Sequence, residues 1–150
     1  MKQFCCTLLF FLATLTSYAQ NFADFFQDKT LRVDYIFTGD ANRQAIYLDE
    51  LSQLPSWAGR QHHLSELPLA GNGQIIVKDV ATGQCIYKTS FSSLFQEWLS
   101  TDEARTTAKG FENTFLLPFP KKTVEVEITL YSPRKDVMAN FKHIVSRSEE

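Results

Sequence analysis

The sequence has few of the side chains that carry catalytic or metal chemistry, with three histidines and three cysteines among 150 residues. Cys5 and Cys6 lie in an apolar run near the start of the chain, and Cys85 is the remaining cysteine. A chain that loses this run would therefore have no pair of cysteines for an internal disulfide. We expect a fold held together by its hydrophobic core, and we predict no cofactor.

The chain also lacks an excess of charge of either sign. Its 15 basic and 17 acidic residues give a net charge of −2, which provides no basic field for a phosphate backbone. We therefore expect no nucleic-acid partner. A composition of 44% hydrophobic and 21% charged residues is typical of a globular protein, and the length suits one domain.

No apolar run is long enough to cross a membrane. The longest, Phe4 to Leu15, is preceded by Lys2 and followed by Ser17 and Ala19, which is the pattern of a secretory signal peptide. We predict cleavage between Ala19 and Gln20, so that residues 1–19 are a signal peptide and residues 20–150 form the mature domain. The protein is then exported to the periplasm or the outside of the cell, without a stable membrane anchor.

Alternation of apolar and polar residues dominates the rest of the chain and predicts strands. The strongest local pattern is a β-hairpin over residues 74–91, with a turn that contains Gly83. Helical spacing is confined to residues 22–26 and 92–107, the second behind a serine cap. Further strands are predicted over residues 31–38, the first half of 45–54, 110–119, 123–131 and 137–145. The fold class is therefore all-β, an antiparallel β-sandwich of about seven strands with one or two short helices.

A long segment without periodicity, residues 52–73, separates the second predicted strand from the hairpin. Structureless segments of this length are often functional or packed on a neighbour. Trp57 lies in it between Pro55 and Gly59, with little regular structure to bury its ring. We predict an interface here, formed by Trp57, His62 and His63.

This segment also contains the one cluster that resembles a metal site, His62, His63 and Glu66. A catalytic zinc site needs three protein ligands, whereas adjacent histidines point in different directions and this spacing provides two ligands at best. We therefore predict no metal and no catalytic residues.

The remaining candidate catalytic and binding residues are better explained as structural residues. Cys85 is expected to be an ordinary strand residue rather than a nucleophile, and Glu125 and Glu127 to lie on the solvated face of a sheet. Tyr47, Trp57 and Trp98 could stack on sugars, although packing in the core is the commoner role of such rings.

Four segments, taken together and in order, resemble the N-terminal domain of the IgA-peptidase family, metallopeptidase family 64. The resemblance extends from about Phe22 to Val145, and it rests on LRVDYIFTGDA, YLDELSQLPSWAGRQHHLSELPLAGNGQI, YKTSFSSLFQEWLSTDEA and KGFENTFLLPFPKK. It implies a secreted zinc metallopeptidase in which a small β-sandwich precedes a larger catalytic domain. The zinc motif of that family, His-Glu-x-x-His, is missing, because no histidine of this chain is followed by glutamate.

The expected function is therefore that of a non-catalytic accessory domain, present as a fragment or as a stand-alone protein. Its expected partner is a catalytic zinc-peptidase domain, in the same chain or in another. The alternative is an independent secreted module that binds glycans or peptides through the segment around Trp57.

Overall fold

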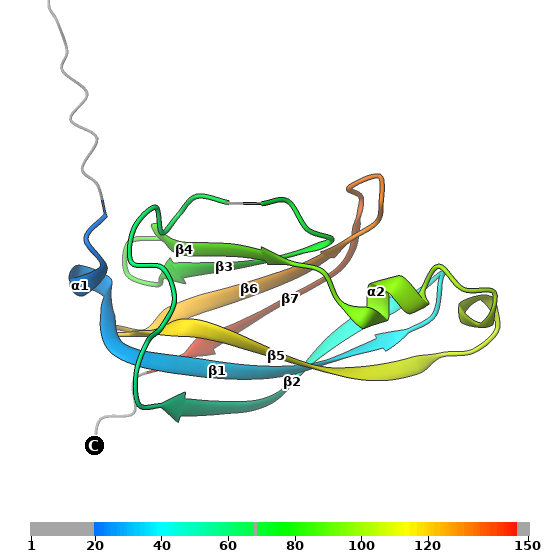
Figure 1. Ribbon diagram of the computed structural model, residues 1–150, viewed down its shortest axis with the longest axis horizontal. Coiled ribbons are helices and arrows are strands. Elements are labelled where there is room, and N and C mark those ends of the chain that lie inside the picture. Colours follow the sequence, from blue (N-terminus) through cyan, green and yellow to red (C-terminus); the bar gives the residue numbers. More distant parts are fainter. Residues whose placement is uncertain (1–19, 68, 147–150) are drawn as a thin grey trace, which may run out of the picture.

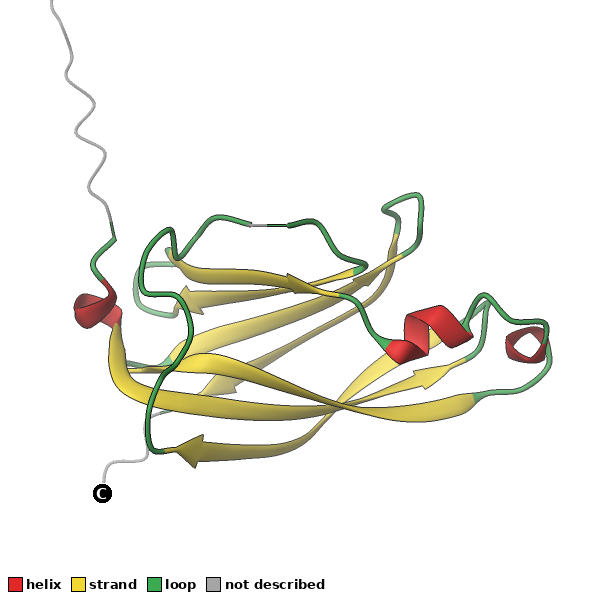
Figure 2. Cartoon of the chain, viewed as in Figure 1, coloured by secondary structure: helices red, strands yellow, loops and turns green. Residues whose placement is uncertain are grey.

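The computed structural model describes residues 20–67 and 69–146, and these fold into two antiparallel sheets that pack face to face (Figures 1 and 2). One sheet has the order β2-β1-β5 and the other β4-β3-β6-β7. The strands are β1 Phe26–Gly39, β2 Gln44–Leu54, β3 Gly73–Asp79, β4 Cys85–Phe91, β5 Lys109–Pro120, β6 Val124–Tyr131 and β7 Val137–Val145. The predicted fold class is confirmed.

Strand β1 is the centre of the smaller sheet and shows why alternation specifies this fold. Val33, Tyr35 and Phe37 are fully buried between the sheets, and the residues between them face outward. The strand pairs with β2 along one edge and with β5 along the other. The β1–β2 pairing has a register shift between Asp34 and Tyr35, and β2 continues past it to Leu54. The segment predicted to begin at residue 52 therefore begins at Pro55.

The predicted hairpin over residues 74–91 is confirmed. Strands β3 and β4 pair antiparallel, as do β6 and β7. In the β3–β4 turn the Asp79 carboxylate accepts hydrogen bonds from the backbone N–H of Thr82 at 2.8 Å and its hydroxyl at 3.0 Å. Gly83 follows with a φ of +70°, a backbone conformation that favours glycine.

The two helices are shorter than the helical spacing suggests. Helix α1 spans Phe22–Phe25, and Phe26 already belongs to β1. Helix α2 spans Leu94–Trp98 behind the predicted cap, where the Ser93 side chain accepts a hydrogen bond from the backbone of Gln96. A 3-10 turn, Glu103–Arg105, completes the region predicted as one helix.

The core lies between the sheets and holds most of the aromatic residues. Phe95 of α2 is fully buried, and its ring packs on Phe37 of β1 and Phe111 of β5. The edge strands β2 and β7 approach each other along one side of the sandwich. At the opposite side β4 is an edge strand of its sheet, and residues 55–72 run beside it.

The predicted signal peptide, with its cleavage residue Ala19, lies outside the described residues. Gln20 is the first described residue, and its side-chain amide donates a hydrogen bond to the carbonyl of Cys85 at 2.8 Å. Within residues 20–67 and 69–146, no helix has the length and apolar character needed to cross a membrane.

Candidate functional site

Residues 55–72, here called the strap, connect β2 to β3 and lie along the free edge of β4 (Figure 1). The backbone N–H of Lys88 donates to the carbonyl of Leu64 at 2.8 Å, and the Leu64 side chain is 1% exposed within the core. The strap thus binds strand backbone that would otherwise be open to another chain. The described residues of the strap therefore pack on the domain, although none of them belongs to a helix or strand.

Trp57 is where the structure differs most from the sequence prediction. Its side chain is 9% exposed and belongs to the core, so the domain itself buries the ring and no interface is needed to do so. The ring meets Tyr87 of β4 edge-on, with 6.1 Å between the centroids, and its indole N–H donates to the carbonyl of Arg60 at 3.1 Å. Gly59 is required beside it, because a Cβ there would lie 2.2 Å from the ring.

Arg60 fixes the strap to β4. Its guanidinium donates to the carbonyls of His63 at 2.7 Å, Glu66 at 2.9 Å and Leu64 at 3.0 Å, and also to that of Lys88 on the strand. The same group lies over the Tyr87 ring, 5.0 Å from its centroid. The single guanidinium therefore donates hydrogen bonds to carbonyl groups of both the strap and the strand. No pattern in the sequence predicted this role of Arg60.

His62 and His63 lie on the outer surface of the strap, as an interface would require. Both are exposed, and His63 Nδ1 lies 3.1 Å from Glu66 Oε1. With Arg60 and Gln61 these residues line a shallow hollow of about 500 Å³. In the part of the chain that the structure describes, no three His, Cys, Asp or Glu side chains come together as a metal site would need.

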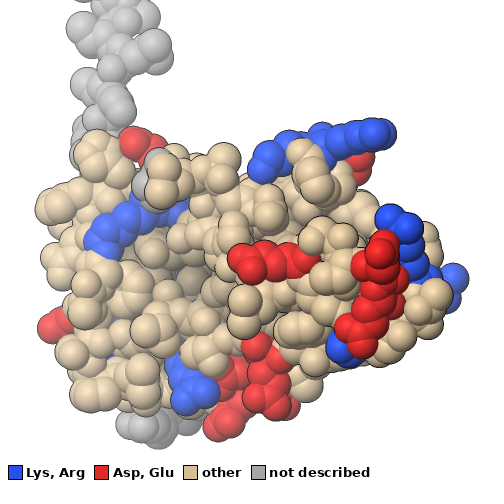
Figure 3. All heavy atoms as spheres, turned by 45° about the vertical axis from the view of Figure 1, so that its right-hand side comes forward, with Lys and Arg blue, Asp and Glu red and all other residues tan. Residues whose placement is uncertain are grey.

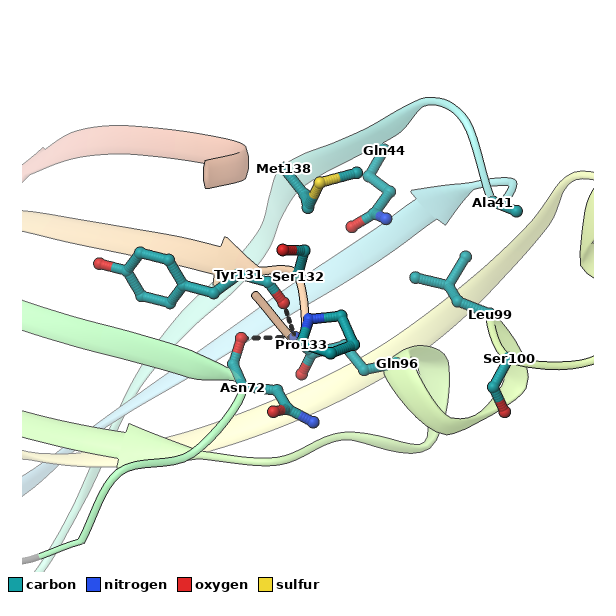
Figure 4. A pocket seen from close by; sticks show the side chains of 10 residues that line it. All are labelled: Ala41, Gln44, Asn72, Gln96, Leu99, Ser100, Tyr131, Ser132, Pro133 and Met138. Carbon is teal, nitrogen blue, oxygen red and sulfur yellow. Dashed lines mark hydrogen bonds between the residues drawn. The ribbon is translucent and has the colours of Figure 1, made fainter. Parts of the chain in front are cut away.

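A second hollow, of about 220 Å³, lies at the opposite end of the sandwich (Figure 4). Its walls come from the β1–β2 turn, helix α2 and the residues after it, the β6–β7 turn, and the last residue of the strap. Gln96 is held in place, because its amide donates to the carbonyls of Asn72 and, at 3.4 Å, Tyr131. The lining side chains carry no charge: they are Ala41, Gln44, Asn72, Gln96, Leu99, Ser100, Tyr131, Ser132, Pro133 and Met138.

The rings considered as a sugar platform do not assemble. Trp57 is buried on Tyr87, Trp98 packs on Phe95 and Phe111, and Tyr47 lies on β2 with 58% of its side chain exposed. No ring contact joins any two of these three among the described residues.

Cys85 and the paired glutamates behave as strand residues. Cys85 begins β4 and is partly buried, and burial raises the pKa of its thiol, which disfavours the nucleophilic thiolate. Glu127 forms ion pairs with Lys78 at 3.0 Å and Lys142 at 3.4 Å, and Lys142 also reaches Glu125. These pairs form the solvated outer face of the larger sheet. Elsewhere, in the view of Figure 3, acidic and basic side chains are interspersed.

Comparison with known proteins assigns the chain to a protein family. The family model described as Peptidase M64 N-terminus matches residues 21–142, a range that runs from α1 into β7 and includes the strap. No curated protein matches the sequence. Because the model covers most of the chain, this protein belongs to the family defined by the N-terminal domain of the family 64 peptidases.

Proposed function

We propose that this chain is a non-catalytic accessory domain of an exported zinc metallopeptidase, and that it docks on the catalytic domain of such an enzyme. The observation that carries the proposal is the family match over residues 21–142, which is to the N-terminal part of these peptidases. The sequence supports it, since no histidine is followed by the glutamate of the zinc motif. The catalytic domain would lie in the same chain or in another.

The strap supplies the docking surface in this proposal. Its inner side is anchored by Trp57 and Leu64 in the core, so its outer side is presented in one arrangement before a partner binds. That outer side carries His62 and His63 beside the hollow, and Leu69 with 79% of its side chain exposed. A preorganised surface loses less conformational entropy on association than a flexible loop would.

A peptidase assay tests the absence of catalysis. Incubated with added zinc and a protein substrate such as casein, the purified chain is expected to release no peptides, because the sequence supplies no zinc motif. Chelator-sensitive cleavage that copurifies with the chain would contradict the proposal. The matched control is the double variant His62→Ala, His63→Ala: any zinc-dependent activity that this variant loses would assign a metal to the strap.

A further inference from the structure

A hydrogen bond between a buried and a half-buried polar side chain joins the two sheets of the sandwich. The Tyr35 hydroxyl on β1 lies 2.6 Å from His143 Nε2 on β7. Tyr35 is fully buried, and His143 is half-buried. The Tyr35 and His143 rings meet nearly edge-on with centroids 5.7 Å apart, and the Phe141 ring contacts both, 5.8 Å from the imidazole and 6.4 Å from the tyrosine ring.

We propose that this Tyr35–His143 contact is an acid-sensitive latch, which holds β7 onto β1 while the imidazole is neutral and releases that edge of the sandwich when the imidazole is protonated. Strand β7 is suited to local release because it is an edge strand, paired through its backbone to β6 alone. Its approach to β2 closes the side of the sandwich. The latch is independent of the function proposed for the strap.

Buried surroundings make the neutral imidazole the favoured form. Burial keeps the pKa of Tyr35 far above its ordinary value, so the hydroxyl stays protonated and is able to donate to Nε2 of a neutral His143. Burial also lowers the pKa of His143 from its ordinary value of 6.5, and the backbone of Ile144 opposes this by a smaller amount. Its Nδ1 is shielded from solvent and has no hydrogen-bond partner of normal geometry among the described residues.

The charged groups described on the surrounding strands do not stabilise the positive charge of a protonated His143. On β6, Glu125 and Glu127 face outward and pair with Lys142 and Lys78. On β1, Asp34 is held on the outer face by Arg32 and Thr114. On β2, Asp49 and Glu50 are exposed. In the described part of the chain, none of these carboxylates is in ion-pair contact with His143.

The direction of the pH effect follows from the lowered pKa. The open or unfolded state binds a proton at about pH 6.5, whereas the closed state binds it only at lower pH. The stabilisation is therefore complete above pH 6.5 and is lost as the pH falls through 6.5 toward the pKa of the closed state. Within that window the opening equilibrium rises by about tenfold per pH unit for one proton.

Hydrogen exchange of the backbone amides between pH 8 and pH 5, corrected for intrinsic exchange rates, tests the latch. As the pH falls, amides of β7 are expected to open before those of β3, and an NMR titration should give His143 a pKa below 6.5. His143→Gln is expected to abolish the pH dependence in β7, whereas His63→Gln, which changes an exposed histidine, is expected to retain it. Tyr35→Phe should open β7 already at neutral pH.

Uniform opening of all strands with falling pH would overturn the proposal, because no local latch would then exist. The same holds if His143→Gln keeps the pH dependence of the native protein. If either variant of the latch fails to fold, the titration of His143 in the native protein decides alone: a pKa at or above 6.5 contradicts the inference.

Discussion

Replacing Trp57 by alanine is expected to destabilise the domain by about 3–5 kcal/mol, the range for removing a large aromatic side chain from a core. The ring is 9% exposed and packs on Tyr87, so its loss leaves a cavity beneath the strap. The carbonyl of Arg60 also loses the indole N–H that donates to it. The measurement is urea unfolding of the purified chain, with the midpoint compared between the variant and the native protein.

Tyr47→Ala provides the matched control for Trp57→Ala. It also removes a large aromatic ring, but one that is 58% exposed on β2, so its effect is expected to stay within about 0.5 kcal/mol. Similar losses from both variants would contradict the burial of Trp57. A Trp57→Ala variant with native stability would restore the interpretation of Trp57 as an exposed interface residue.

The Arg60→Met variant is expected to cost about 2–3 kcal/mol, a magnitude reached when a hydrogen-bonded charge is removed and its acceptors stay partly buried. Methionine keeps much of the aliphatic stem but donates to none of the carbonyls of His63, Leu64, Glu66 and Lys88 that Arg60 now binds. The strap should then detach from β4 in part of the population. Limited digestion by subtilisin, which does not need an arginine, is expected to cut within residues 55–72 several-fold faster than in the native chain.

Arg105→Met is the control for Arg60→Met. The Arg105 side chain is 74% exposed and forms a surface ion pair with Asp102 at 3.4 Å, and such pairs contribute little to stability. We expect native stability and native resistance of the strap to digestion. If Arg60→Met behaves like this control, the strap is held by Leu64 and Trp57 alone, and Arg60 is not its anchor.

The sequence predicted most of the strands because they repeat a local pattern, whereas only the first half of β2 was predicted, and its burial does not alternate. Strand β7 spans residues 137–145 as expected, and the hairpin of β3 and β4 begins one residue before its prediction and ends at the predicted residue. The alternation in β7 places His143 on the same inner face of the strand as Val145. What alternation along one strand could not show is that Tyr35, 108 positions earlier, lies opposite this histidine.

The order of the strap could not be predicted, because its contacts have no period in the sequence. Arg60 binds carbonyls three to six residues ahead and another 28 residues away. Leu64 and Trp57 reach the core as single residues, without the regular spacing of a helix or strand. The sequence therefore did not show that Trp57 packs in the core, and an interface through His62 and His63 stays a prediction.

The measurement that tests the proposed function most directly is the binding of this chain to a catalytic domain of a family 64 peptidase, by isothermal titration calorimetry. We expect a saturable complex that the double variant His62→Ala, His63→Ala weakens by at least roughly tenfold, equivalent to about 1.4 kcal/mol. Glu112→Ala, on the exposed outer face of β5, is expected to bind as the native chain does. Absence of a complex, or a strap variant that binds as tightly as the native chain, would contradict docking through the strap.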